Sequence, residues 1–274
     1  MTVLNIVVTV LGLAAGVLII AFLVRKGLPA FKRARAYSLA MQESGHLGDA
    51  PSDKDFDFML KFAGFFVRHF VGKLTVVGAE KLAAADAPAM VIFNHGSLLD
   101  VAIAPVVLNR KARYPAAQGV MKAFGGLAAL LFGRWGVYAV NLENGASARE
   151  ATSKVMKQRE IVVLFPEAWT NMDGVVKPFT KTGAIRTTRD AAEFLDEEIK
   201  IYPGYMRYGR YPGKWILKLP IPLQWLVPLV GAFRYKRGCT IVIGDGIGCN
   251  SLPADHHEAM NVLHDAVVAL DPGK

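Results

Sequence analysis

The chain of 274 residues carries a formal net charge of +9, and aliphatic and aromatic residues make up 53% of it, with a mean hydropathy of +0.30. This length favours one large domain with an appended segment, and this hydropathy is typical of a chain that is partly in lipid or lies against it. The two cysteines, Cys239 and Cys249, lack metal-ligand spacing and exclude a disulfide framework, so they indicate a reducing compartment. The positive charge favours an acidic partner: phosphate groups, an anionic membrane surface or nucleic acid.

Residues 3–24, VLNIVVTVLGLAAGVLIIAFLV, contain no charged side chain. At about 1.5 Å per residue, a helix of this length spans roughly 33 Å and can cross a bilayer core. A signal peptide is the alternative, but no Lys or Arg precedes the run and no small-residue cleavage site follows it. Basic residues follow directly, with no acidic residue before Glu43: Arg25, Lys26, Lys32, Arg33 and Arg35. Residues 1–35 therefore predict a single-pass transmembrane helix with a basic flank, which places the rest of the chain on the cytoplasmic face.

Residues 36–55 predict a linker, because the stretch QESGHLGDAPSDKDFDF (42–58) is polar and acidic. The domain that follows, residues 56–274, opens with FDFMLKFAGFFVRHFVGKL (56–74), where phenylalanines recur at helical spacing between basic residues. Either this helix packs into the core, or it is amphipathic and lies in the membrane interface beside the anchor. The spacing alone does not distinguish these two interpretations.

From residue 74 onward, short apolar runs alternate with helical patterns. The runs that predict strands are LTVVG (74–78), AMVIF (89–93), VYAV (137–140), EIVVLF (160–165), KIYPGYMRY (200–208) and TIVIG (240–244). Helices are expected after residue 97 and over residues 118–132, 146–159 and 184–195. This alternation predicts an α/β domain with a mostly parallel central sheet flanked by helices.

The segment from Ile199 to Gly244 contains no Asp or Glu. It also holds Trp215, Trp225 and the proline-interrupted apolar stretch LPIPLQWLVPLV. Its basic residues are Lys200, Arg207, Arg210, Lys214, Lys218, Arg234, Lys236 and Arg237. This segment is either a solvated basic face over a core strand or a surface that contacts anionic lipid or a phosphate-bearing donor, since each Lys or Arg near such a membrane contributes about 1 kcal/mol.

The stretch NHGSLLD (94–100) follows a predicted buried strand and places a histidine and an aspartate five residues apart. A carboxylate beside an imidazole fixes its tautomer and stabilises its protonated form, as a general base requires, so His95 and Asp100 are candidate catalytic residues. The alternative is structural, because Ser97 and Asp100 have the S-x-x-D spacing of a capping box at the start of a helix. The same geometry would bring the Asp100 carboxylate toward His95.

The stretch LFPEAWT (164–170) places Glu167 at the carboxyl end of another predicted strand, where α/β proteins bind ligands. Downstream, VVKPFTKTGAIR (175–186) gathers Lys177, Lys181 and Arg186 around Gly183, and such a loop before a helix suits an anionic group. Other chemistry is not indicated. The sequence has no nucleophile elbow, P-loop or dinucleotide fingerprint, and DHHEAMNVLHD (255–265) is typical of an amphipathic helix. No metal and no cofactor is expected.

Together, these motifs resemble those of the lysophosphatidic acid acyltransferase superfamily, also called 1-acylglycerol-3-phosphate O-acyltransferases or glycerolipid acyltransferases. The family's first motif, NHxSxxD, is matched by Asn94, His95, Ser97 and Asp100, and its third, FPEG, by Phe165, Pro166 and Glu167. TKTGA (180–184) is similar to the family's F-K-x-G-A, GVYAVN (136–141) lies where the second motif belongs, and IKIYPGY (199–205) resembles the fourth. The order and spacing of these motifs carry the resemblance over about residues 70–245.

Two departures from the family pattern bear on the acyl acceptor. Asn141-Leu142 stand where the second motif usually has Asp-Arg, and Ala168, Trp169 and Thr170 stand where the third continues with glycine, a small residue and arginine. In the family these arginines are thought to hold the acceptor's phosphate, and each such contact is typically worth about 1.5–3 kcal/mol. The departures predict an acceptor other than an ordinary phosphate-bearing one, unless Arg134, Lys177 or Lys181 substitutes. The bulky Trp169 predicts a different acceptor pocket.

The resemblance implies a membrane-bound O-acyltransferase that moves a fatty acyl chain from acyl-CoA or acyl carrier protein to a (lyso)lipid hydroxyl. It implies direct transfer with His95 as general base oriented by Asp100, and acceptor contacts from Glu167, Trp169, Lys181 and Arg134. Membrane lipids and an anionic membrane surface are the expected partners, and nucleic acid is not. Two alternatives remain: a thioesterase or lipid hydrolase, in which water replaces the acceptor, and a non-catalytic lipid-binding relative.

Overall fold

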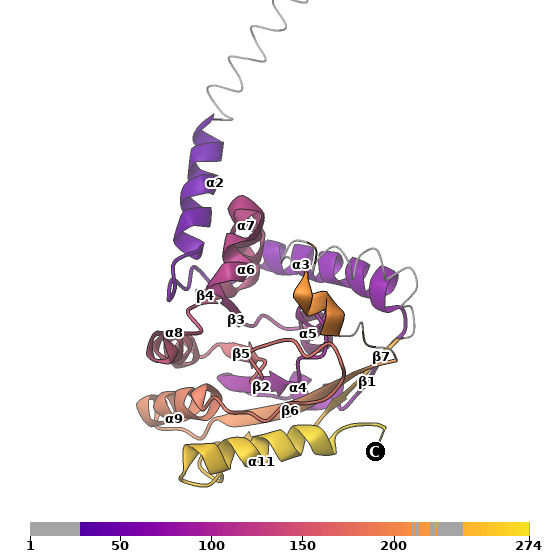
Figure 1. The fold of residues 1–274 in the computed structure, drawn as a ribbon. Helices are drawn as coiled ribbons and strands as arrows, with labels where there is room; N and C mark the ends of the chain where they lie inside the picture. The colour runs from indigo at the N-terminus through magenta and orange to yellow at the C-terminus, as the bar shows by residue number, and fades with distance from the viewer. Residues whose placement is uncertain (1–27, 210, 212–213, 220–222, 224–237, 274) are drawn as a thin grey trace, which may run out of the picture.

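The computed structural model describes residues 28–209, 211, 214–219, 223 and 238–273, which form an α/β domain around a central sheet (Figure 1). The strands of this sheet lie in the order β1-β7-β6-β2-β5, with β8 paired to β6. Their bounds are β1 (Leu74–Val77), β2 (Ala89–Phe93), β5 (Ile161–Leu164), β6 (Lys200–Tyr208), β7 (Cys239–Ile243) and β8 (Ile247–Gly248). The pairs β2–β5, β2–β6 and β1–β7 are parallel, whereas β7 and β8 run antiparallel to β6.

A second parallel pair, β3 (Tyr114–Ala117) and β4 (Val137–Val140), lies beyond the β5 edge of the sheet. Arg113 joins this pair to β5, because its N–H donates to the Ile161 carbonyl at 2.8 Å and its carbonyl accepts from the Val163 N–H at 2.9 Å. The guanidinium of Arg113 is buried as well and donates to the Leu47 carbonyl. One residue therefore links both pieces of sheet and the segment before α3.

Helices cover both faces of the sheet (Figure 1). One face carries α8 (Gly145–Lys157), α9 (Gly183–Leu195) and α11 (His256–Ala269), and the other carries α4 (Ala79–Ala83) and α5 (Asp100–Leu108), with α3 (Asp53–Phe66) packed on α5. The remaining helical segments are α2 (Leu28–Met41), η2 (Val67–Val71), α6 (Gln118–Lys122), η3 (Ala123–Gly126), α7 (Leu127–Phe132), η4 (Gly133–Trp135) and η5 (Lys214–Lys218).

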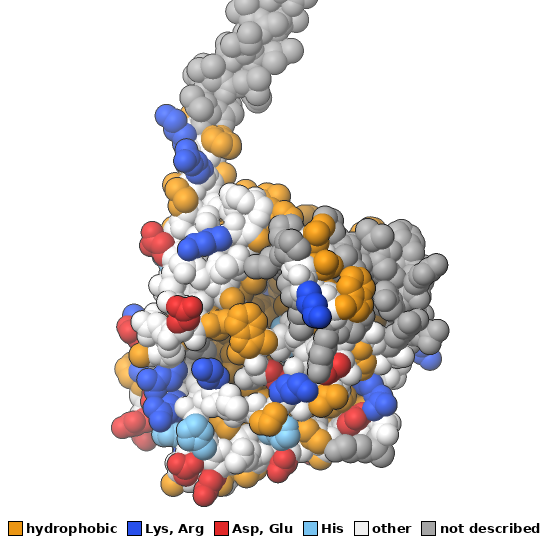
Figure 2. Space-filling model, in the orientation of Figure 1, with side chains coloured by type: hydrophobic (Ala, Val, Ile, Leu, Met, Phe, Trp, Pro, Cys, Tyr) orange, Lys and Arg blue, Asp and Glu red, His pale blue; other side chains and the backbone are white. Residues whose placement is uncertain are grey.

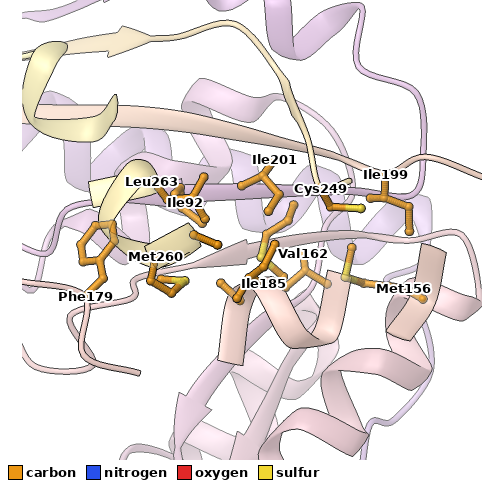
Figure 3. Packing of buried hydrophobic residues seen from close by; sticks show 14 of the residues in the cluster. Ile92, Met156, Val162, Phe179, Ile185, Ile199, Ile201, Cys249, Met260 and Leu263 are labelled. Atoms are coloured by element: carbon orange, nitrogen blue, oxygen red, sulfur yellow. The ribbon is translucent and has the colours of Figure 1, made fainter. Parts of the chain in front are cut away.

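Strand β2 lies at the centre of the core, and all five of its residues are buried. Side chains alternate across a strand, so Met90 and Ile92 face the helices α8, α9 and α11, while Val91 and Phe93 face α4 and α5. Figure 3 shows the first of these two layers, where α11 and α9 place Leu263 and other apolar side chains over the sheet. Burial on both faces is typical of parallel strands and explains the uninterrupted apolar run AMVIF.

The mostly parallel sheet flanked by helices confirms the predicted fold class, and β2, β4 and β6 have the predicted bounds. The single helix predicted over residues 118–132 is wrong. Phe124, Gly125 and Gly126 all have positive φ, so the chain breaks between α6 and α7. A Cβ on Gly126 would lie 2.5 Å from Ser38 Oγ, so this glycine lets α2 approach the break closely.

The segment before the sheet differs in part from the predicted division at residues 35 and 55. Helix α2 continues through residue 35 to Met41, which is fully buried, and Ser38 donates to the Gly126 carbonyl at 2.7 Å. The stretch between α2 and α3 is therefore shorter than the predicted linker. The predicted anchor, residues 3–24, lies outside the described residues, and within the described ranges no helix is long and apolar enough to span a bilayer.

Helix α3 combines features of both interpretations of the phenylalanine-rich segment. Met59 and Ala63, four residues apart, form its buried side. Phe58, Phe62 and Phe65 remain 53%, 38% and 53% exposed, although the first two also contact the ring of Trp135. The helix is thus anchored to the domain through small and flexible side chains while it presents an aromatic surface to its surroundings. Figure 2 shows further hydrophobic side chains around a hollow near the middle of one face of the molecule.

Candidate active site

The candidate site lies at the carboxyl ends of β2 and β5. These strands are parallel neighbours with Ile92 beside Leu164, so the segments that follow them leave the sheet at the same edge. The backbone N–H of His95 donates to Glu167 Oε1 at 2.7 Å. The strand-end motifs predicted separately from the sequence are therefore brought together, as the topology of a parallel sheet requires.

His95 and Asp100 form a hydrogen-bonded pair, with 2.9 Å between His95 Nδ1 and Asp100 Oδ2. The Asp100 side chain is fully buried, and the His95 side chain is 14% exposed. An ionised carboxylate only accepts hydrogen bonds, so this contact assigns the Nδ1 proton to the bond with Asp100. In the neutral imidazole, Nε2 then carries the lone pair that a general base needs.

The Asp100 carboxylate also accepts a hydrogen bond within the turn before α5, but Asp100 is the first residue of this helix and its N-cap, Leu99, has no side-chain cap bond, so the predicted capping box forms only in part. Its Oδ2 accepts from the Ser97 N–H at 3.0 Å, and the Ser97 Oγ accepts from the Leu99 N–H at 3.2 Å. This return contact from the carboxylate is one half of a capping box. The contact with the Ser97 N–H holds the carboxylate in the position from which it reaches His95.

Tyr208, at the end of β6, supplies the third hydrogen bond to the Asp100 side chain. Its hydroxyl donates to Asp100 Oδ1. Burial, and then the charge of Asp100, hold the pKa of Tyr208 well above its ordinary value, so the hydroxyl remains a donor at neutral pH. No sequence pattern indicates this residue, because 108 positions separate it from Asp100.

Glu167 connects three parts of the site through its carboxylate. Beyond the His95 N–H, its Oε2 accepts from the Lys177 N–H at 2.8 Å and from the Asn171 side-chain amide. The Asn171 N–H in turn donates to the His95 carbonyl at 2.8 Å. Burial raises the pKa of Glu167, while the N–H donors from His95 and Lys177 act in the opposite direction. Both oxygens thus have partners within the protein, and a contact between Glu167 and the acceptor stays a prediction.

Two further contacts fix the His95 loop. The Asn94 side chain continues the pairing of β2 with β6, because its Oδ1 accepts from the Met206 N–H at 2.7 Å and its Nδ2 donates to the Met206 carbonyl at 3.1 Å. The ring of Phe165 stacks on the imidazole of His95, with 4.5 Å between the centroids and 26° between the planes. The imidazole is therefore positioned from β6, from the β5 end and from α5.

The segment after Glu167 passes beside Nε2 of His95, the ring nitrogen that does not contact Asp100. Ala168 has a φ of 61°, a left-handed conformation that suits the glycine usual at this place in the resembled family. Thr170 Oγ1 lies 3.1 Å from His95 Nε2. Trp169, which lies between Ala168 and Thr170 in the sequence, is 74% exposed, so its indole is available to a molecule outside the protein.

The predicted cationic residues have contacts or exposure in the structure that do not involve His95 directly. Arg134 is exposed on η4 with its guanidinium carbon 6.0 Å from the Tyr37 ring centroid, so it packs against α2. Lys177 contacts Glu167 through its backbone, and its Nζ is 3.8 Å from Asp173 Oδ2. Lys181 is exposed just before α9. Acceptor contacts by Arg134, Lys181 and Trp169 stay predictions.

The structure is an α/β domain in which a histidine is hydrogen-bonded to a buried aspartate at the carboxyl ends of parallel strands. Residues 73–207 match the family model described as Acyltransferase, and this range includes His95, Asp100 and Glu167. By this match, residues 73–207 form an acyltransferase domain, and the protein is an acyltransferase.

A solved structure of similar fold is the crystal structure of the 1-acyl-sn-glycerophosphate (LPA) acyltransferase, PlsC, from Thermotoga maritima. The TM-score is 0.53 at 17% identity, and the alignment covers 79% of this chain and 78% of that chain. At this identity the likeness shows the fold. No curated protein matches the chain.

Proposed function

We propose that the protein is a membrane-bound glycerolipid O-acyltransferase, which moves a fatty acyl chain from acyl-CoA or acyl carrier protein to a (lyso)lipid hydroxyl. The observation that carries the proposal is the contact of 2.9 Å between His95 Nδ1 and Asp100 Oδ2 in the NHGSLLD motif. The family match and the fold shared with an LPA acyltransferase support it.

In this reaction His95 Nε2 takes the proton of the acceptor hydroxyl as the hydroxyl oxygen attacks the thioester carbonyl. The buried Asp100 carboxylate stabilises the imidazolium that forms. The tetrahedral intermediate then expels the thiolate, and His95 returns the proton to the leaving sulfur. General bases of this kind contribute typically about 10²- to 10⁴-fold to the rate.

The proposed acceptor has a head group with little negative charge near the reacting hydroxyl. Leu142 stands at one place where the resembled family has arginine, and it packs partly buried against the apolar core. Thr170 stands at the other and offers a neutral hydroxyl. A dianionic phosphate without cationic partners in a partly dehydrated site is unfavourable, so a sugar, an amino-acid lipid or a choline-type head beside Trp169 fits better.

The proposed location is the cytoplasmic face of a membrane, with residues 3–24 as a single-pass anchor. The charge-free run and the basic residues after it support the anchor. The exposed rings of Phe58, Phe62 and Phe65 on α3 support a second contact with lipid, because aromatic side chains favour the interface. Both contacts hold the site where a lipid acceptor resides, which raises its effective concentration.

The test uses purified full-length protein, acyl-CoA or acyl carrier protein as donor, and a panel of lysolipids, with and without acceptor. The proposal predicts an acylated lipid, and it predicts that His95→Ala lowers the rate by at least about 10²-fold without changing the unfolding temperature. His257→Ala, on the exposed start of α11, is the matched control and retains full activity. Thioester cleavage without lipid product identifies a hydrolase, and binding without turnover identifies a lipid-binding relative.

A further inference from the structure

The hydrogen bond between Thr170 and His95 occupies the atom on which the proposed reaction depends. Thr170 Oγ1 lies 3.1 Å from His95 Nε2, on the opposite side of the ring from the contact between Nδ1 and Asp100. Because Nδ1 carries the proton in that contact, Nε2 is an acceptor and the Thr170 hydroxyl is the donor. The protein therefore places an alcohol of its own at the lone pair of the base.

This position is the one that an acceptor hydroxyl must reach. A lone pair on Nε2 accepts one strong hydrogen bond, so Thr170, an acceptor hydroxyl and a water molecule compete for the same place. Water at this place would be activated in the same way as a lipid hydroxyl, and the thioester would then be hydrolysed. Excluding water from reactive groups is a recognised way to suppress such side reactions.

The surroundings of Thr170 allow its side chain to give way while its backbone stays fixed. The next residue, Asn171, is held by the bond from its N–H to the His95 carbonyl and by its side-chain contact with Glu167. Thr170 itself is only half-buried, and rotation about its single χ1 bond removes Oγ1 from Nε2. An arriving alcohol can thus exchange one hydrogen bond for another without a change of backbone.

We propose that Thr170 is a positioning residue whose hydroxyl stands in for the acceptor hydroxyl at His95 Nε2, and that it thereby favours acyl transfer over hydrolysis. The inference rests on the proposed role of His95. It assigns Thr170 no covalent part in the reaction, so the bonds made and broken are those of the transfer itself.

The first experiment measures whether Nε2 is covered, and it does not depend on acyl transfer. Diethyl pyrocarbonate, which modifies unprotonated histidine nitrogen, is applied to the full-length protein, and the modification of the His95 peptide is followed by mass spectrometry. Thr170→Ala and the isosteric Thr170→Val should raise the rate by about 3- to 10-fold, the scale of one neutral hydrogen bond, while Thr170→Ser matches the unchanged protein. Equal rates in all four proteins overturn the inference. Equal modification rates in Thr170→Val and Thr170→Ser also overturn it, because the size of the side chain alone, without a hydroxyl, would then protect His95 Nε2.

The second experiment measures acyl-CoA hydrolysis without acceptor and transfer with acceptor. Thr170→Ala should raise the ratio of hydrolysis to transfer by about 3- to 10-fold, and His95→Ala in the same chain should abolish the gain. An unchanged ratio overturns the inference, and so does an acyl adduct on Thr170, since the threonine would then be a nucleophile. If no lysolipid is acylated by the unaltered protein, the proposed function fails, whereas the modification rates still decide whether Thr170 covers Nε2.

Discussion

Replacing Tyr208 with phenylalanine removes one oxygen atom from the site and leaves the buried ring in place. The hydroxyl donates to Oδ1 of Asp100, whose other oxygen accepts from His95 Nδ1 and the Ser97 N–H. The variant therefore leaves Oδ1 of a fully buried carboxylate without its protein donor. We expect the carboxylate to hold His95 less firmly and to stabilise its protonated form less well.

The size of the effect follows from the kind of bond that is lost. A hydrogen bond to a charged group contributes about 1.5–3 kcal/mol, and each 1.4 kcal/mol corresponds to about a factor of ten in rate. Since Asp100 keeps its two other donors, we expect the lower end, a fall in kcat/KM of about 10-fold. The loss should appear in kcat with KM unchanged, because Tyr208 acts through the base. Steady-state kinetics over a range of acceptor concentrations measure both.

Tyr138→Phe is the matched control. Its hydroxyl is also fully buried and donates at 2.8 Å to Thr152 Oγ1, between β4 and α8. Both variants should lose stability, by about 0.5–1.5 kcal/mol for the neutral bond of Tyr138, but only Tyr208→Phe should lose kcat. If the two variants have equal kcat, Tyr208 stabilises the fold and does not position Asp100, and the reasoning fails.

Three further changes test other parts of the proposal. Asp100→Asn should lower kcat strongly, because an amide cannot accept all three donors, and a variant that loses only thermal stability would leave Asp100 with the capping role alone. A chain without residues 1–27 should still float with anionic liposomes in a salt-dependent manner, owing to the exposed rings of α3 and the basic residues between Ile199 and Gly244. Binding indifferent to salt and lipid charge would contradict this. Lysophosphatidic acid should not have the highest kcat/KM in an acceptor panel. If it does, Lys181→Ala should be damaging, because a lysine would then hold the phosphate.

The meeting of His95 and Glu167 could be predicted from the sequence because it depends only on strand order and direction. Each follows an apolar run, and the carboxyl ends of parallel neighbours share one edge. Tyr208 could not be found in this way. Nine consecutive residues of β6 predict a strand, but no local pattern shows which distant carboxylate its last residue meets.

Side-chain direction explains the other differences. Arg134 and Lys181 were predicted as acceptor contacts because they lie close to the motifs along the chain. In the structure, η4 directs the Arg134 side chain toward the ring of Tyr37. The break at Gly126 depends on the approach of α2, a contact over 88 positions, which helical periodicity does not report. The sequence singles out Thr170 only because it stands where the resembled family has arginine. Its contact with His95 is found only in the structure.

The Glu167 carboxylate has a consequence for how the site opens. It accepts from the N–H groups of His95 and Lys177 and from the Asn171 side chain, so these segments share one partly buried partner. Releasing one of these donors leaves the partly buried carboxylate with fewer partners, so we expect the segments to open together. Hydrogen exchange at the His95 and Lys177 amides should then proceed at matched rates, as a single unit of the native-state ensemble. We then expect substrates to enter by rotation of side chains such as those of Trp169 and Thr170, without opening of the backbone that carries the base.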